Sequence, residues 1–185
     1  MIMKVVKKDW SRELHMKFWE KGKDLTLILI TYPPKERGIA TLKRGKNVWN
    51  YIPSIKRVIK IPSSMRGTSW MGSHFTNDDL VREYSLSRDY NAELLREDAS
   101  NFYLALRPKP EAAVVWGKIE IVVSKTKLVP LKEVYFSEKG EKIRQLEFRE
   151  IKRVGRRWFP FHWVLLPLKK PGEKTELIMK KSNLM

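Results

Sequence analysis

Apolar and polar residues alternate along most of the chain, beginning with its first residues. In the segment RELHMKFWEK (12–21), the side chains of Leu14, Met16 and Phe18 are apolar and those between them are mostly polar. Because successive side chains of a β-strand point to opposite faces of a sheet, this period of two predicts an antiparallel strand with one buried face. Similar patterns predict further strands at 1–6, 25–32, 38–44, 47–52, 56–61, 91–98, 101–108, 114–124, 128–137, 142–154, 157–166 and 175–181.

Short turn sequences separate these strands, among them RGKN (44–47), DASN (98–101) and SEKGEK (137–142). The spacing is typical of a meander. Because open twisted sheets rarely stay flat beyond about ten strands, the sheet must curl. We therefore predict a mainly β (α+β) fold: an incomplete, strongly curved antiparallel β-barrel with a short helix and loops covering its concave apolar face. At 185 residues, the chain is expected to form one domain spanning residues 1–185.

One helix start is well marked. Thr76 is a good N-cap, Asp79 completes an aspartate version of the capping box, and Phe75 and Leu80 occupy the two staple positions. The predicted helix runs from about residue 77 to residue 83 or 84. A helix this short is not stable alone in water, so we expect it to dock on the curved sheet.

The composition restricts the possible chemistry. Lys and Arg number 38 against 21 Asp and Glu, a formal net charge of +17, so nucleic acid, an anionic lipid surface or an acidic protein face are candidate partners. Cysteine is absent, which excludes disulfides, thiol catalysis and thiolate metal sites. The longest apolar run, residues 25–32, is far shorter than the roughly 20 residues of a membrane-spanning helix.

Few residues suggest catalysis. His15, His74 and His162 do not have the spacing of a metal site. Asp78 and Asp79 are adjacent at a predicted helix start, where carboxylates complement the helix dipole. Glycine-rich phosphate loops and a nucleophile elbow are missing. We therefore predict no catalytic residue, no metal and no cofactor.

The segment RRWFPFHW (156–163) leaves a second function open. It interleaves basic and aromatic residues, a combination that can stack the bases of single-stranded nucleic acid on a β-barrel. No motif typical of RNA-binding sheets accompanies it. A basic β-barrel that binds single-stranded nucleic acid therefore remains the alternative function.

Four longer segments carry a family resemblance: NVWNYIPSIKRVIKI (47–61), SWMGSHFTNDDL (69–80), PKPEAAVVWGKI (108–119) and VPLKEVYFSEKGEKIR (129–144). Together they resemble the outer-membrane lipoprotein-sorting protein family, the LolA-like group of periplasmic carriers, and the match extends from about Arg12 to Leu177. The resemblance implies an incomplete barrel whose hollow is covered by helices and loops. It further implies a periplasmic, non-enzymatic carrier that moves lipid-modified cargo towards the outer membrane.

The resemblance also implies partners. These are the acyl chains of lipoproteins or of another lipid, an inner-membrane donor protein, an outer-membrane acceptor protein and, transiently, an anionic membrane surface; nucleic acid is not expected. Members of the family usually begin with a signal peptide and a helix ahead of the first strand, whereas this chain opens on the strand-like MIMKVV. We therefore expect a trimmed or misassigned start, with one covering helix missing.

A carrier for acyl chains needs apolar surface, because each CH2 group that leaves a membrane for water costs about 0.8 kcal/mol. Residues in the inward phase of the predicted strands and helix are the candidates for this lining. They are Phe18, Leu27, Leu29, Trp49, Tyr51, Leu80, Trp116 and Phe136. Since a slip of one residue reverses the face of a strand, each could instead belong to the ordinary core or to the other face.

The stretch SSMRGTSWMGSHFTNDDL (63–80) places large apolar side chains among serines and glycines without any regular period. One interpretation is a flap over the hollow, formed by Met65, Trp70, Met71 and Phe75 with Gly67 and Gly72 as pivots. The other is a loop that simply plugs the core. Arg57, Lys60 and Arg66 lie close to this stretch in the sequence and are candidate contacts for lipid headgroups or partner proteins.

Overall fold

The computed structural model describes residues 1–22, 24–82, 86–112 and 114–180, and within these residues thirteen strands form one antiparallel sheet. The strands are β1 (Ile2–Val6), β2 (Ser11–Lys21), β3 (Leu25–Tyr32), β4 (Ala40–Arg44), β5 (Asn47–Ile52), β6 (Arg57–Lys60), β7 (Tyr90–Glu97), β8 (Asn101–Pro108), β9 (Lys118–Ser124), β10 (Pro130–Phe136), β11 (Lys142–Val154), β12 (Arg157–Pro167) and β13 (Lys174–Ile178).

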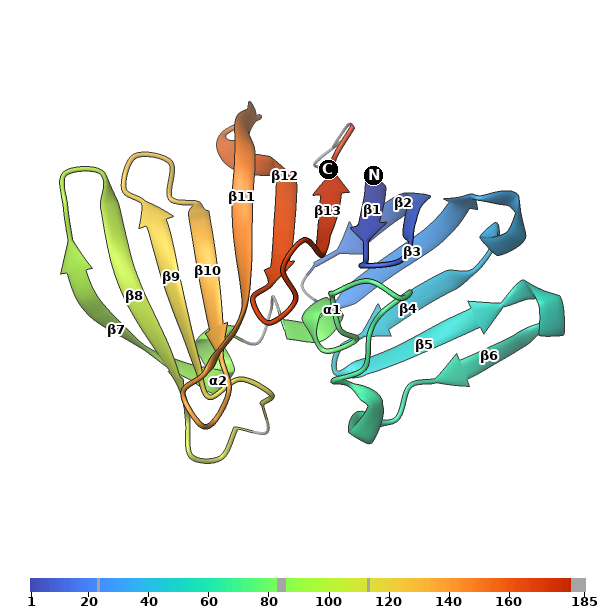
Figure 1. The fold of residues 1–185 in the computed structure, drawn as a ribbon, viewed down its shortest axis with the longest axis horizontal. Helices are drawn as coiled ribbons and strands as arrows, with labels where there is room; N and C mark the ends of the chain where they lie inside the picture. Colours follow the sequence, from blue (N-terminus) through green and yellow to red (C-terminus); the bar gives the residue numbers. More distant parts are fainter. Residues whose placement is uncertain (23, 83–85, 113, 181–185) are drawn as a thin grey trace.

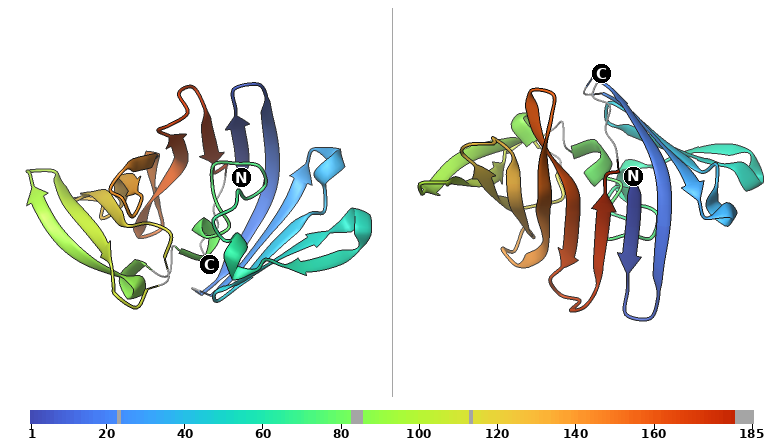
Figure 2. Two further views of the ribbon diagram at one scale, coloured as in Figure 1. Left: turned by 60° about the horizontal axis from the view of Figure 1, so that its bottom comes forward. Right: turned by 90° about the horizontal axis from the view of Figure 1, so that it is seen from above.

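Two meanders meet at the centre of this sheet. The strand order is β6-β5-β4-β3-β2-β1-β13-β12-β11-β10-β9-β8-β7, so the first and last strands are direct neighbours (Figure 1). We call β1–β6 the N-wing and β7–β13 the C-wing. The outermost strands, β6 and β7, do not pair with each other. Figure 2 shows the two wings curving towards one another, which confirms the predicted incomplete barrel.

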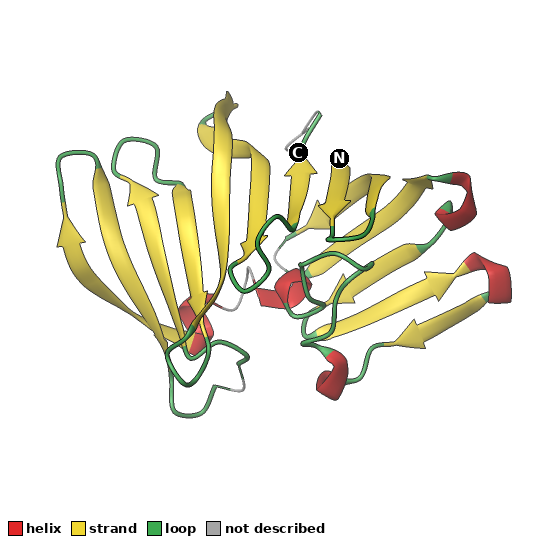
Figure 3. Ribbon diagram, viewed as in Figure 1, coloured by secondary structure: helices red, strands yellow, loops and turns green. Residues whose placement is uncertain are grey.

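The helices are few and short (Figure 3). They are α1 (Asp79–Arg82), α2 (Leu86–Asp89) and the 3-10 turns η1 (Pro34–Glu36), η2 (Pro53–Ile55) and η3 (Ser63–Met65). Among the helices that the structure describes, none is long and apolar enough to cross a membrane.

The sheet order explains the irregular stretch that follows β6. The chain leaves one edge of the sheet at β6 and re-enters at the opposite edge as β7. The connection, residues 61–89, is called the crossover here, and its described part runs over the concave face between the wings (Figures 1 and 2). It therefore needs apolar side chains, because it covers a sheet face that is itself apolar. No repeating period is required of a segment that is neither a long helix nor a strand.

The predicted helix start is confirmed in its hydrogen bonds and corrected in its position. The Thr76 N–H donates to Asp79 Oδ2 at 2.8 Å, and the Asp79 N–H donates to Thr76 Oγ1 at 3.3 Å. Helix α1 nevertheless begins at Asp79, two residues later than predicted. The N–H groups of Asn77 and Asp78 bond within the crossover, to Thr68 O at 3.1 Å and to Arg66 O at 2.9 Å. The predicted end at residue 83 or 84 lies outside the described residues, and the sequence pattern does not predict α2.

The predicted strand at 114–124 is also shorter in the structure, where β9 begins at Lys118. Trp116 leaves the strand direction and packs in the core against Tyr135, with ring centroids 5.3 Å apart. The Gly117 N–H donates to Phe136 O at 3.0 Å. A Cβ on Gly117 would lie 2.7 Å from the Cα of Glu138, so only glycine allows this close approach of two backbones.

Candidate ligand cavity on the concave face

A cavity of about 410 Å³ lies between the concave face of the sheet and the crossover. This volume is within the roughly 300–1,000 Å³ of small-molecule sites. The N-wing contributes Phe18 and Ile28, the crossover contributes Trp70, Phe75 and Leu80, and α2 contributes Leu86. From the C-wing come Val129, Pro130, Tyr135, Leu146, Phe148, Trp158, Phe159, Pro160, Trp163, Leu177 and Met179. Most of the wall is therefore aliphatic or aromatic.

The crossover forms a small hairpin where it covers the cavity. The Trp70 N–H donates to Phe75 O at 2.8 Å, and the two side chains are only 3% and 6% exposed. The indole Nε1 of Trp70 donates to Thr41 Oγ1 on β4 at 3.2 Å. Met71 and Gly72 form the tip, both with positive φ angles, 51° and 71°. Trp70 and Phe75 are therefore fixed points of the cavity wall in this structure.

Two further contacts attach the hairpin to the centre of the sheet. On β2, Arg12 Nη2 donates to Met71 O at 2.7 Å. Next to β13, the His74 ring is 2.8 Å from Thr175 Oγ1 through Nδ1 and 2.8 Å from Glu173 Oε2 through Nε2. Burial lowers the pKa of His74, although its hydrogen bond to Glu173 acts in the opposite direction. The neutral imidazole is thus the form that the fold favours.

A buried ion pair connects α1 to the C-wing. Arg144 on β11 donates from Nη1 to Asp79 Oδ2 at 2.7 Å and from Nη2 to Asp79 Oδ1 at 2.5 Å. Its guanidinium carbon lies 4.5 Å from the ring centroid of Trp116 and 4.4 Å from that of Tyr135. Breaking such a pair by removing one partner costs on the order of 3–5 kcal/mol, because the other charge is left buried. This pair therefore fixes where the crossover lies.

Four polar side chains of the cavity wall bond to one another in two pairs. Besides the pair of Asp79 and Arg144, the Tyr135 hydroxyl donates to the Glu133 carboxylate across a short contact. A ligand in the cavity would meet these groups already engaged, so its main favourable contacts would be apolar. The arrangement suits a hydrocarbon chain better than a sugar or a nucleotide.

The predicted lining residues are only partly brought together. Phe18 and Leu80 line the cavity. Trp116 belongs to the core behind the wall, where it packs on Tyr135. Phe136 is buried outside the cavity lining and lies under the ammonium of Lys118, 3.9 Å from the ring centroid.

The inward phase predicted for four N-wing residues is wrong by one residue. Because Phe18 of β2 pairs with Ile28 of β3, Ile28 shares the concave face and its neighbours point outward. The four residues that lie on the outer face are Leu27, Leu29, Trp49 and Tyr51. The segment LTLILITY is apolar at nearly every position, so its sequence gives no alternation from which the face could be read.

The predicted flap residues occupy the crossover but differ in their surroundings. Trp70 and Phe75 line the cavity, and Met71 packs against the core from the hairpin tip. Met65 is largely exposed. Gly72 has a positive φ, whereas Gly67 does not, and a Cβ on Gly67 would point into open space.

The three predicted headgroup contacts lie near the edge of the N-wing. Arg57 and Lys60 are the first and last residues of the exposed edge strand β6. Arg66 instead bonds within the protein, because its Nη2 donates to Lys46 O in the turn between β4 and β5 at 2.8 Å. It links the crossover to the N-wing.

Base stacking would need the aromatic side chains of the segment RRWFPFHW on an open surface, but most of these side chains line the cavity. Trp158, Phe159, Pro160 and Trp163 all line the concave cavity. Sequence reasoning missed these residues as lining, and the signal that could have found them is the length of the β11–β12 hairpin, whose strands have thirteen and eleven residues. Strands this long extend past the central sheet and can close over its hollow. Nucleic acid binding is therefore not favoured.

No cluster suited to a metal ion occurs among the described residues: no group of three or more His, Cys, Asp or Glu side chains lies close enough together to hold one.

Comparisons with known proteins bear on the fold. A family model with the description "Uncharacterized protein" matches residues 22–184. No curated protein matches the sequence. Among solved structures, an outer membrane lipoprotein-sorting protein domain from Vibrio parahaemolyticus has a TM-score of 0.84 at 24% identity, covering 97% of this chain and 81% of that chain.

Two other solved structures are similar. A DUF1329 family protein from Desulfovibrio piger has a TM-score of 0.84 at 20% identity, covering 95% of this chain and 79% of that one. A LolA superfamily protein from Nitrosomonas europaea has a TM-score of 0.74 at 22% identity, covering 98% and 84%. These similarities confirm, at the level of the fold, the resemblance that the sequence segments carry.

Proposed function

Because the chain belongs to the family whose model matches residues 22–184 and shares the fold of lipoprotein-sorting and LolA superfamily proteins, we propose that it is a non-enzymatic carrier of acyl chains. The observation on which the proposal rests is the largely apolar cavity of about 410 Å³ between the sheet and the crossover. Its cargo would be the acyl chains of a lipoprotein or of another lipid. No cofactor takes part.

The energetics of transfer support this assignment. Moving an acyl chain from a membrane into water costs about 0.8 kcal/mol for each CH2 group, so a carrier must offer comparable apolar surface. The side chains of Phe18, Leu146 and Phe148 supply such surface from two strands, one in each wing. Since two pairs of polar groups in the wall, Asp79 with Arg144 and Glu133 with Tyr135, already bond to each other, their desolvation by an entering hydrocarbon chain costs less.

The proposal includes a compartment and partners. The carrier would act in the periplasm, receive cargo from an inner-membrane donor and deliver it towards an outer-membrane acceptor. We further propose that residues 1–185 form one domain, and the continuous sheet supports this. Arg57, Lys60 and Arg66 would contact the headgroups or the acidic surfaces of these partners.

The crossover would act as the lid of the cavity. Its hairpin bears Trp70 and Phe75 on the cavity wall and is held to the sheet by the packing of these side chains and by hydrogen bonds such as that from Arg12 to Met71 O. Entry of cargo would require these contacts to open. In this proposal Met65, Gly67, Met71 and Gly72 belong to the moving segment.

Two adjacent aromatic residues provide the test. Phe18 and Trp19 are 44% and 46% exposed and lie on opposite faces of β2, and Phe18 alone lines the cavity. We expect Phe18→Ala to weaken binding of a fluorescent fatty acid by about fivefold to tenfold, since about 1 kcal/mol of apolar contact is lost. The matched control Trp19→Ala should bind the fatty acid as the unchanged protein does.

Lipid extraction of the purified protein, followed by mass spectrometry, would identify natural cargo directly. Copurifying lipids with acyl chains are expected. The proposal fails if the protein neither copurifies with nor takes up any acyl chain, or if Trp19→Ala weakens fatty acid binding as much as Phe18→Ala.

A further inference from the structure

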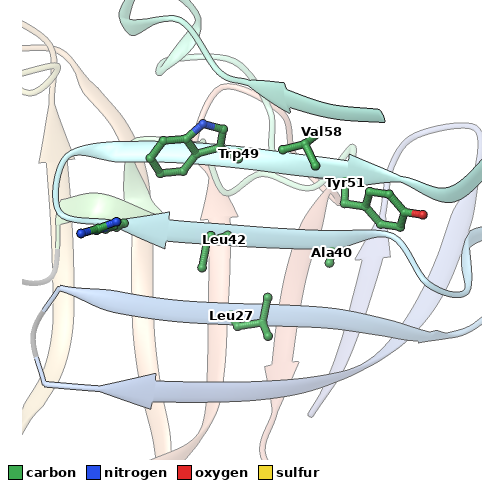
Figure 4. Close-up of a pocket in the computed structure, with 7 residues that line it drawn as sticks. Leu27, Ala40, Leu42, Trp49, Tyr51 and Val58 are labelled. Carbon is green, nitrogen blue, oxygen red and sulfur yellow. The ribbon is translucent and has the colours of Figure 1, made fainter. Parts of the chain in front are cut away.

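The outer face of the N-wing bears a second hollow, separate from the cavity described above. It has a volume of about 370 Å³. Figure 4 shows six of the side chains around it projecting from β3, β4, β5 and β6. They are Leu27, Ala40, Leu42, Trp49, Tyr51 and Val58, and we call them the outer patch. Arg44 lines the hollow at one end.

The strand register assembles the outer patch. Leu27 pairs with Leu42, which in turn pairs with Trp49, so these three side chains form one row across the sheet. A parallel row runs from Ala40 through Tyr51 to Val58. Side chains that face each other across strands are in contact range on one face, so the two rows make a continuous apolar surface. Trp19 on β2 extends the first row, because it pairs with Leu27.

The patch is exposed to solvent. Leu27, Leu42 and Tyr51 are each about 40% exposed and Val58 is 66% exposed. Apolar side chains scattered singly over a surface are ordinary, but contiguous exposed apolar patches mark interaction sites. Nothing in the described part of the chain covers this face, since the crossover lies on the opposite, concave side.

Cations surround the patch. Lys17 pairs with Leu29 at one border, Lys21 and Arg44 both pair with Leu25 at another, and Lys60 pairs with Trp49 at the edge. The Lys60 ammonium lies 5.7 Å from the Trp49 ring centroid. Among the described residues, none of these four cations forms an ion pair, and no Asp or Glu pairs with a patch residue.

We infer that the outer patch docks the protein on the anionic surface of a phospholipid bilayer. The patch combines the two side-chain types that the interface of a membrane favours. Trp and Tyr rings sit at the level of the headgroups, and Lys and Arg extend their charged ends to anionic phosphates while their stems cover apolar surface. A basic rim whose four cations form no ion pair among the described residues complements the negative charge of such a surface.

Charge also decides against a second copy of the chain as the occupant. A symmetric dimer through this face would bring two basic rims together, in a protein whose formal net charge is already +17. An acidic protein partner would have the complementary charge, and the experiment below separates it from a bilayer.

The docking surface is structurally independent of cargo binding. Along β2 the side chains alternate between the two sites: Phe18 and Glu20 line the concave cavity, whereas Trp19 and Lys21 point to the outer face. One layer of sheet therefore separates the two sites. A membrane contact on the outer face leaves the concave cavity free to bind cargo. The inference therefore does not depend on which cargo the cavity binds.

Flotation with vesicles tests the inference. We expect the full chain to bind vesicles of equimolar phosphatidylcholine and phosphatidylglycerol, to bind vesicles of phosphatidylcholine alone far more weakly, and to dissociate as salt is raised. The double variant Arg44→Glu with Lys60→Glu should bind anionic vesicles at least about tenfold more weakly, since each basic residue near the surface contributes roughly fivefold. Trp49→Ser should weaken binding severalfold by removing the central apolar contact.

The matched control is Lys139→Glu with Lys142→Glu, which changes the net charge by the same amount at exposed positions of the C-wing. This variant should retain most of the binding. Equal loss in both double variants would overturn the inference, because overall charge would then explain the attraction. Absence of binding to anionic vesicles, an unaffected Trp49→Ser variant, or dimers in sedimentation that Trp49→Ser dissolves would overturn it as well.

Two further measurements guard against trivial loss of binding. Melting temperatures of all variants should stay near that of the unchanged protein, because the substituted side chains are exposed or half-exposed. The double variant Arg44→Gln with Lys60→Gln removes the two positive charges without adding negative ones and provides a second test. Fatty acid uptake should be unchanged in the single variant Arg44→Glu, because Arg44 lines the outer hollow and not the concave cavity. A lack of vesicle binding by the unchanged protein would therefore contradict the docking inference alone, and a lack of fatty acid uptake would contradict the proposed carrier function alone.

Discussion

His74 is a titratable side chain placed between the crossover and β13. Its imidazole side chain is 6% exposed and contacts Thr175 and Glu173. Lys7 and Lys170 also act on it, and both disfavour its protonated form. Since burial is the largest influence and lowers the pKa of His74, the folded protein resists protonation of a group that titrates freely in the unfolded chain.

The sign of the resulting pH dependence follows from that direction. Because the pKa of His74 is lower in the folded state, the unfolded chain binds the proton more readily, and stability is lost as pH falls below the ordinary histidine value of about 6.5. We expect the free energy of unfolding in urea to decrease from about pH 7.5 to about pH 5.5, a range that brackets this value. His74→Gln should show a flatter profile over the same range, and His15→Gln should keep the slope because it leaves His74 in place. A slope unchanged in His74→Gln would contradict the assignment.

The crossover is the element whose function depends most on local backbone conformation. Its hairpin turns at Met71 and Gly72, which both have positive φ angles. For an L-residue other than glycine this conformation costs roughly 1–2 kcal/mol, so a turn of this kind is commonly built with glycine. Gly67, earlier in the same segment, has no such requirement. The two predicted pivots are therefore physically different.

Alanine substitution distinguishes the two glycines. Gly72→Ala should lower the free energy of unfolding by about 1 kcal/mol, because a Cβ strains the positive φ even though its nearest neighbour would be 3.8 Å away. Gly67→Ala should be neutral or slightly stabilising, because it restricts the unfolded chain and meets nothing in the folded one. Both values come from urea denaturation. Equal destabilisation by the two substitutions would show that the turn at residues 71 and 72 is not the constrained part of the crossover.

One continuous sheet joins two wings that are far apart in the chain. The wings meet where β1 pairs with β13, residues Ile2 to Val6 against Lys174 to Ile178. The buried side chains of Met3, Val5 and Leu177 lie at this junction. The pair of Asp79 and Arg144 adds a second connection through the crossover. Neither wing keeps its full set of core contacts without the other.

This continuity predicts a single cooperative unfolding transition. Far-ultraviolet circular dichroism, which reports the sheet, and tryptophan fluorescence, which reports residues on both wings, should give coincident midpoints in urea. Two separated transitions would indicate that the wings fold independently and that residues 1–185 are not one domain. Addition of a fatty acid that binds the cavity should raise the urea midpoint of unfolding, because a ligand that binds only the folded state stabilises it.

Local sequence is sufficient to establish the fold class, because strict alternation of apolar and polar residues suits a half-buried strand and not a helix. The pattern predicts the strand at 142–154 to the residue, and the hydrogen bonds of the Thr76–Asp79 capping box form as the spacing requires. Both features depend on neighbours in sequence. The apolar stretch at 63–80 is likewise recognisable as unusual, although the sequence does not separate its two interpretations.

The face that each strand turns to the cavity depends on contacts that are distant in sequence. Leu27 and Trp49 are expected inside and lie outside, because β3 and β5 carry apolar side chains on both faces and the face of each strand follows from its pairing, beginning with Phe18 and Ile28. The alternation pattern likewise does not place Trp158 and Trp163 in the cavity wall. They belong to the β11–β12 hairpin, which is far in sequence from the N-wing residues on the other side of the cavity. A period of two identifies a strand, but the long-range pairing of strands determines what each side chain faces.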